Sequence, residues 1–428
     1  MKSATLSIDA LQDAVGRLPD NGLTATRRVA LKHFSENGMP SSRHEDWKYT
    51  DLTHIVDIGN RWLEEKEDNS SPSDIGELVD NICSSVDADW LVICRGQIDA
   101  QSIDAFDQAG VDIERLSESD DKLQFAAPLG DLNMALLHDG LRIRVSDAAK
   151  LRRPIGILLV DDAASVAGMT QARIEIDVAD CARASFVEHH VSTGSADHYA
   201  NSVVRLTLGD GAHASYVRIQ DRQPHHNQTN RLAVILGRDS EFEHCGFDLG
   251  GRLVRNDLEI DIAMPGSRST FDGLYLVGDQ QHIDNHTRAD HRVGPAESQQ
   301  EYRGILTGRA RGVWNGKAIV HAGADGSDAQ QANHNLLLSD KAEIDAKPEL
   351  EIYADDVKCS HGTTVGQLDE TSLFYLRTRG LSKYEAKQVL TRAFAQAIVS
   401  KSPIASIHDL LAEKIAERLE QLMHGANT

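Results

Sequence analysis

The chain has 428 residues, of which 40% are hydrophobic, and its mean hydropathy of -0.37 is typical of a globular protein in water. This length exceeds what one small core can organise, so we expect two or three structural units. The formal net charge of -22 disfavours nucleic acid and anionic membranes as partners.

The five cysteines form an odd and widely spaced set, which argues against a disulfide framework and for a reducing compartment. No C-x-x-C pair is present, so the chain holds no self-sufficient cage for zinc or an iron–sulfur cluster. The first ten residues contain no apolar core of signal-peptide length, and no stretch approaches the roughly 18 apolar residues of a membrane helix. We therefore expect a cytoplasmic protein.

We expect residues 1–150 to form a mixed N-terminal domain that begins with helices. Near its start, Leu6, Leu11, Val15 and Leu18 recur at helical spacing. Further along the domain, short apolar pieces alternate with acidic loops.

Residues 151–355 change to short strands with alternating apolar residues. Four of these strands start at Arg173, Val204, Leu232 and Leu258, which are 31, 28 and 26 residues apart, and a similar strand starts at Leu336. Such a period is typical of a solenoid, in which each coil buries its apolar face against the next coil. Almost no helical periodicity intervenes, so we predict a mainly β fold with a parallel β-helix core capped by helical ends. Because the period is imperfect, a β-sandwich stays open as the alternative.

Residues 356–428 are predicted to form a C-terminal helical domain. Asp369 can N-cap a helix that ends at Gly380, and Ser382 with Glu385 forms a capping box for the next helix. Pro403 ends that second helix, and a third begins near Ser406. Apolar stripes lie at Val389, Leu390, Ala393, Phe394, Ala397 and Ile398, and at Leu411, Ile415, Leu419 and Leu422. Burial against the protein's own core is the first interpretation of these stripes, and docking of a partner is the second.

The candidate chemistry is concentrated at Cys359 and His361, where the strand region gives way to helices. On an extended strand, residues i and i+2 point to the same face, so the thiol and the imidazole should lie side by side. These donors suit iron, iron–sulfur species, zinc or copper, and Asp355 and Asp356 add negative charge that favours a cation. Two donors do not complete a four-coordinate site, so a functional pair needs further donors from elsewhere.

A competing hypothesis is an enzyme on a β-helix, such as a polysaccharide lyase or a metal hydrolase that uses His282, His286 and His291. The surroundings of these histidines are typical of strands and turns, and the glutamate of an H-E-x-x-H motif is missing. Histidines that hydrogen-bond within a polar ladder are therefore favoured. No P-loop, dinucleotide-binding glycine motif or G-x-S-x-G elbow is present. A purely structural partner without ligands is a third reading.

Segments along most of the chain resemble the SufB/SufD family of the SUF system for iron–sulfur cluster assembly. The resemblance is carried by Arg43 and by residues 45–50, 284–287, 304–317, 328–331, 335–340, 347–362 and 374–377. The run V-K-C-S-H-G-x-T-V-G-Q around Cys359 and the lack of clustered N-terminal cysteines favour the SufD branch over the SufB branch. Trp314 stands where Phe is common and Thr363 where Ala is frequent, but neither departure removes a metal donor.

The resemblance implies a right-handed parallel β-helix flanked by N- and C-terminal helical domains. It also implies a non-enzymatic scaffold that pairs with the SufB paralogue through the β-helix ends and binds the SufC ATPase on its C-terminal helices, at about residues 369–424. A homodimer of the chain alone stays open. His361 matches the family histidine implicated in building a nascent cluster at the SufB–SufD interface, and Cys359 matches a nearby thiol. The iron–sulfur cluster would be transient and shared with SufB, with no permanently bound cofactor.

Overall fold

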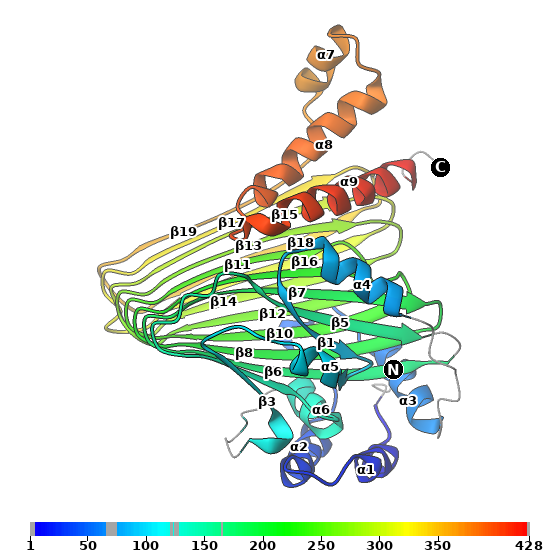
Figure 1. Ribbon diagram of the computed structural model, residues 1–428. Coiled ribbons are helices and arrows are strands. Elements are labelled where there is room, and N and C mark those ends of the chain that lie inside the picture. The colour runs from blue at the N-terminus through cyan, green and yellow to red at the C-terminus, as the bar shows by residue number, and fades with distance from the viewer. Residues whose placement is uncertain (1–4, 66–74, 120–122, 124–127, 164–165, 426–428) are drawn as a thin grey trace.

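Two long β-sheets form the centre of the computed structural model, which describes residues 5–65, 75–119, 123, 128–163 and 166–425 (Figure 1). Among these residues one sheet has ten strands and the other has nine. In spatial order, the ten-stranded sheet contains β2 (Gln97–Ile98), β1 (Asp89–Cys94), β5 (Ile155–Ala163), β7 (Arg183–Gly194), β9 (His213–Asp221), β11 (Glu241–Asp248), β13 (Arg268–Val277), β15 (Glu297–Leu306), β17 (Asp328–Leu337) and β19 (Lys358–Gly366). The nine-stranded sheet contains β3 (Val111–Arg115), β4 (Leu141–Val145), β6 (Gly168–Val178), β8 (His198–Leu208), β10 (His226–Leu236), β12 (Leu253–Ile262), β14 (His282–His291), β16 (Arg311–Val320) and β18 (Glu343–Ile352).

From β5 onward the chain alternates between the two sheets, and every neighbouring pair of strands is parallel. This arrangement is a parallel β-helix, and the parallel pairing excludes the β-sandwich. Val204, Leu232 and Leu258 are direct register neighbours on β8, β10 and β12, so the predicted repeat corresponds to successive coils. Leu336 lies in the other sheet.

The sheets extend beyond residues 151–355 at both ends. Strands β1, β3 and β4 come earlier in the chain, and β19 comes later, yet all four are hydrogen-bonded into the sheets. Two of the connections at the N-terminal end are antiparallel, β1 with β2 and β3 with β4. Side chains of this region, including Ile98, Ile103 and Ile113, pack against the apolar interior and close that end of the β-helix.

Side chains alternate between the interior of the β-helix and its outer surface. On β7, Phe186 belongs to the interior core, whereas Val187 packs outward beneath the C-terminal helices. The histidine doublet that follows obeys the same alternation, and both His189 and His190 are fully buried because helices cover the outer face. Cys245 is also buried beneath these helices, as expected for a structural cysteine.

Helices cover both outer faces (Figure 1). They are α1 (Ile8–Arg17), α2 (Thr24–Asn37), η1 (Glu45–Trp47), α3 (Thr53–Glu64), α4 (Gly76–Ser85), α5 (Ala100–Asp104), η2 (Leu116–Glu118), α6 (Pro128–Leu136), α7 (Glu370–Thr378), α8 (Lys383–Val399), η3 (Ala405–Ile407) and α9 (His408–Gly425). The predicted caps are present: Asp369 caps α7, and Ser382 with Glu385 forms a capping box on α8. None of the described helices combines the length and the apolar character that crossing a bilayer requires.

The C-terminal helices differ in what they contact. The apolar stripe of α9 is buried on the outer face of the ten-stranded sheet, so the core interpretation is correct there. On α8 the predicted stripe is partly wrong, because Thr391, Ala395 and Ile398 are buried whereas Val389 and Ala393 are exposed. Only the later turns of α8 reach the sheet, and α7 with the first turns of α8 stands away from it (Figure 1).

Candidate functional site

The last strand of each sheet forms the open end of the β-helix, which is made by β18 and β19. Cys359 and His361 lie on β19, where their register partners on β17 are Ala329 and Gln331. Both partners are buried in the interior, so Cys359 and His361 continue two inward-facing ladders. No further coil follows β19 in either sheet of the described chain, so Cys359 is half-buried and His361 is exposed. The two side chains share one face, as the strand spacing predicts; their role as ligands stays a prediction.

Polar residues line the interior behind this pair. In the ladder of Cys359, Ser298 shares a 2.8 Å hydrogen bond with Nε2 of His291 on the opposite sheet. In the ladder of His361, the Thr287 hydroxyl donates to Oε1 of Gln300. These bonds join β14 and β15 across the interior and fix a coil that is separated from the open end by only the coil of β16 and β17.

The wall facing β19 is apolar. The inward positions of β18 include Ile344, Ala346 and Leu350, which are half-buried, and Ile352, which is 43% exposed. On the opposite side of the opening, Val365 is 52% exposed. Apolar side chains exposed around unpaired strand edges are typical of a surface that another protein covers.

The Cys359 thiol is not activated in the isolated chain. Partial burial raises its pKa and the charge of Asp328 acts in the same direction, while a backbone hydrogen bond with Ala329 opposes them. The thiol is therefore mainly protonated near neutral pH. The sequence pointed to Asp355 and Asp356 as the nearby negative charges, but the acid that acts on Cys359 is Asp328, which the preceding coil brings alongside it.

Cys359 and His361 do not belong to a larger set of donors on this chain. Across the described ranges, no group of three or more His, Cys, Asp or Glu side chains is arranged to hold a metal ion.

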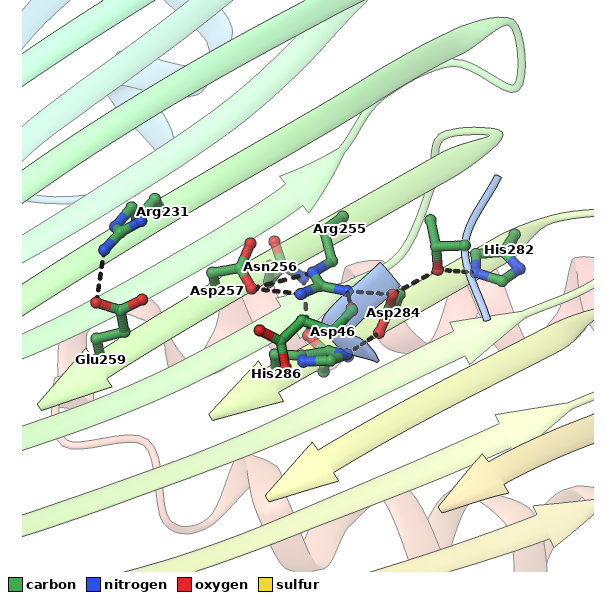
Figure 2. A network of polar contacts seen from close by, with 11 residues as sticks. Asp46, Arg231, Arg255, Asn256, Asp257, Glu259, His282, Asp284 and His286 are labelled. Atoms are coloured by element: carbon green, nitrogen blue, oxygen red, sulfur yellow. Dashed lines mark hydrogen bonds and ion pairs between the residues drawn. The ribbon is translucent and has the colours of Figure 1, made fainter. Parts of the chain in front are cut away.

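The three histidines of the enzyme hypothesis do not converge. His282 and His286 are on the outer face of β14 (Figure 2). His291 points inward to Ser298 instead. His282 Nε2 lies 2.8 Å from the Thr50 hydroxyl, and His286 Nε2 lies 3.0 Å from Oδ1 of Asp284. Burial lowers the pKa of His282, with Asp284 partly opposing this effect, so its imidazole is neutral at neutral pH. The predicted hydrogen-bonding role of these histidines is confirmed.

The network around Arg255 joins two segments that the sequence presents far apart (Figure 2). Arg255 donates to Asp284, at 2.7 Å, and to the carbonyl of Asp46, at 2.8 Å, and the Thr50 hydroxyl donates to the same Asp284 carboxylate. The segments 45–50 and 284–287, which separately carry the family resemblance, thus meet on the outer face of the nine-stranded sheet. Their interaction holds the N-terminal segment against the β-helix. No pattern in the sequence identified Arg255 as the link.

Comparisons with known proteins agree with this architecture. The family model described as "SUF system FeS cluster assembly, SufBD core domain" matches residues 160–394, which include most of the β-helix, β19 and the start of the C-terminal helices. The chain is 29% identical to the iron–sulfur cluster assembly protein SufD of Escherichia coli over 400 residues, which cover 91% of each chain. It is 26% identical to an iron–sulfur cluster assembly SufBD family protein of Synechocystis, with 95% of this chain and 93% of the relative covered.

A third relative, the iron–sulfur cluster assembly protein SufD of Bacillus subtilis, is 27% identical over 298 residues, which cover 68% of this chain and 66% of the relative. The core match spans more than half of the residues and includes the strand that carries Cys359 and His361. On this evidence the chain belongs to the SufB/SufD family and is a SufD-like member of it.

Proposed function

We propose that this protein is a non-enzymatic scaffold subunit in SUF iron–sulfur cluster assembly, and that it offers Cys359 and His361 to a cluster being built. The observation that carries the proposal is their position side by side on the last strand of an uncapped β-helix. The cluster is the cargo of the scaffold, and it leaves when assembly is complete.

The open end is the surface on which we place a SufB-type paralogue. Strands β18 and β19 each leave one edge without a strand neighbour among the described residues, and Ile352 and Val365 expose apolar surface beside them. A second β-helix set end to end against this surface would cover both features. The same end can also pair two copies of this chain when the paralogue is absent.

The remaining cluster ligands would come from the paralogue. Thiolate and imidazole are suitable donors for iron, but a mononuclear or cluster iron needs more than two protein or sulfide donors. Because the pKa of Cys359 is raised, the thiol is mainly protonated in the chain alone, and a cation that binds it would displace the proton. Ligand binding and subunit pairing would therefore be coupled at this end.

The α7–α8 hairpin is the surface on which we place the SufC ATPase. Phe374 is 68% exposed and Tyr375 is 57% exposed, and both lie on a helix that stands away from the sheets. Val389 on α8 adds further exposed apolar surface. Exposed aromatic residues on a projecting hairpin are typical anchors for a partner. ATP hydrolysis would belong to SufC, because this sequence has no P-loop.

The test is His361→Ala in the chain co-produced with SufB and SufC, with His334→Ala as the matched control. His334 lies outward on the neighbouring strand β17 and contacts Thr364 of β19, so its loss disturbs the same end without touching the inward face. Both variants should retain the partners on co-purification. His361→Ala should lose the visible absorbance of the assembled cluster, and His334→Ala should keep it. Full cluster yield from His361→Ala would contradict the site.

Metal analysis of the purified chain without SufB provides an independent test. The interface site predicts less than stoichiometric metal in the chain alone. A stoichiometric metal bound without the paralogue would instead favour the enzyme hypothesis.

A further inference from the structure

Three arginines lie close together on the outer face of the nine-stranded sheet. They are Arg173 on β6, Arg205 on β8 and Arg231 on β10, one from each of three successive strands. Arg173 and Arg231 are both register partners of Val203, and Arg205 follows two residues later on the same strand and the same face. Three long cationic side chains therefore surround one position of the sheet.

Short side chains leave a hollow between these arginines. Val203 occupies the position between Arg173 and Arg231. Arg205 lies in register between Ala233 on β10 and Glu175 on β6, and Glu175 is bonded to Arg173. The resulting arginine hollow has a volume of about 210 Å³. This volume is below the roughly 300–1,000 Å³ of pockets that hold whole drug-sized ligands. It suits a small ion or one group of a larger molecule.

One cation of the arginine hollow, Arg205, has no carboxylate partner among the residues that the structure describes. Arg173 is only 1% exposed, and burial lowers its pKa, with the positive charges of Arg205 and Arg231 acting in the same direction. Its guanidinium bonds to Glu175 at 2.8 Å. Arg231 bonds to Glu259 at 2.6 Å (Figure 2).

The other carboxylates of the hollow are also engaged. Asp261 bonds to Arg292, and Asp290 bonds to Arg288. Arg205 has neither a hydrogen bond nor an ion pair anywhere in the described part of the chain. Arg205 therefore lies beside the buried Arg173 without a carboxylate partner in the described chain. In a protein with a net charge of -22, carboxylates are in excess, so an arginine without such a partner is unexpected.

We propose that the arginine hollow binds a phosphate group. A guanidinium presents parallel N–H donors that match two phosphate oxygens, and a tetrahedral dianion accepts from several directions at once. Arg205 supplies the free donors, and Arg173 and Arg231 supply positive charge at the sides. A planar monovalent carboxylate would satisfy fewer of these donors.

The phosphate group has two possible sources, the free ion or a nucleotide. The arginine hollow continues into a second hollow of about 220 Å³, which shares Arg231 and Glu259 with it and reaches Trp47. This continuation leaves room for the remainder of a phosphorylated ligand. Inorganic phosphate and ADP are therefore the two probes.

The experiment measures binding of each probe to the purified full chain by isothermal titration calorimetry in low-salt buffer. Arg205→Gln removes the cation that has no partner in the described chain. Ala233→Leu adds a larger apolar side chain to the lining of the arginine hollow and keeps every charge. Arg268→Gln is the matched control, because it makes the same change of charge at an exposed arginine on the other sheet. Arg268 has only a weak, solvent-exposed ion pair with Glu297, at 3.6 Å. The loss of one charge-assisted interaction predicts binding weaker by about tenfold or more in Arg205→Gln.

Phosphate binding by the parent chain and by Arg268→Gln, but not by Ala233→Leu, supports a site for the free ion. Binding of ADP alone with the same variant pattern supports a nucleotide as the source. Absence of binding by both probes, or equal binding by Arg205→Gln, overturns the proposal. Arg205→Gln should melt at the parent temperature, because it breaks no bond within the described chain. If it fails to fold, Ala233→Leu alone decides the outcome.

Discussion

The guanidinium of Arg255 lies over the ring of Trp47, with the guanidinium carbon 4.4 Å from the ring centroid. This cation–π contact joins the N-terminal segment to the middle of the β-helix, and the same guanidinium is bonded to the buried carboxylate of Asp284. One arginine thus attaches a segment more than two hundred residues away along the chain to the outer face of the nine-stranded sheet.

Breaking the buried Arg255–Asp284 pair should strongly destabilise the protein. Asp284→Asn removes one of the two carboxylate partners of the buried Arg255 cation, and Asp257 stays bonded to it at 2.7 Å, so the loss should be about 1.5–3 kcal/mol of unfolding free energy. Urea denaturation measures the loss. Asp345→Asn breaks the half-exposed pair with Arg311 and should cost at most about 1 kcal/mol. Equal losses in the two variants would contradict the assignment.

The Arg255–Asp284 pair should make a contribution to the free energy of unfolding that is lost in acid. Burial opposes ionisation of Asp284, but Arg255 and His286 outweigh it and hold its pKa well below the usual range. Because the folded pKa is depressed, this contribution is present above the ordinary carboxyl pKa of about 3.9 and is lost as the pH falls below it. The difference in stability between the parent and Asp284→Asn should therefore be constant at neutral pH and should shrink only in acid.

Asp272 should have the opposite pH dependence. Burial beneath the α8–η3 connection raises its pKa to about 6, although Lys401, with its Nζ 3.4 Å from Oδ1, opposes the shift. A raised folded pKa stabilises the fold below the unfolded value of about 3.9, and this stabilisation is lost as the pH rises through about 6. Relative to Asp272→Asn, the parent should lose about 3 kcal/mol of unfolding free energy between those pH values. Parallel pH profiles would refute the assignment.

Cys359 should react with iodoacetamide as a thiol of raised pKa. Between about pH 7 and pH 8.5 its alkylation rate should rise roughly tenfold per pH unit, because only the thiolate reacts. Peptide mass spectrometry follows the modification, and the fully buried Cys245 is the internal control that should stay unmodified in the folded chain. A rate that levels off near neutral pH would mean that the thiol is activated in the isolated chain.

Two surface variants should separate the two proposed partners. Phe374→Ser on α7 should weaken SufC binding by about 2 kcal/mol or more while leaving the pairing with SufB intact. Val365→Lys at the open end should do the reverse. Both residues are exposed, so neither change should alter the stability of the chain by more than about 0.5 kcal/mol. Pull-down from co-expressed complexes reports both interactions, and loss of both partners in both variants would argue for unfolding.

The coils of the β-helix were predictable because each coil must bury an inward apolar residue at the same place. Val204, Leu232 and Leu258 mark that place, and they are register neighbours. The sheet of a given strand was not predictable, since Leu336 has the same pattern but lies in the opposite sheet. Periodicity also marked Val389 as buried, although the turn of α8 that contains it does not reach the sheet.

For the candidate site, the sequence predicted the shared face of Cys359 and His361 because that face depends only on strand geometry. The influence of Asp328 could not be read from the sequence, because it arises from the return of the chain after one coil. The link between Arg255 and Trp47 was hidden for the same reason. Contacts between coils and between distant segments depend on how the residues of successive coils are aligned, and this alignment is set by the whole β-helix.

The two ends of the β-helix differ in their ability to associate, and only the end formed by β18 and β19 presents parallel strand edges to another molecule. At the N-terminal end β2 has only two residues and β3 runs antiparallel to its neighbour, so the parallel ladders of the coils stop there and leave a poorer surface for another parallel coil. End-to-end association of these molecules is therefore expected at one end only, so one molecule can add one partner. If two molecules pair through β18 and β19, as we propose, the open end of each is covered, and the assembly would close as a pair instead of propagating into a fibre.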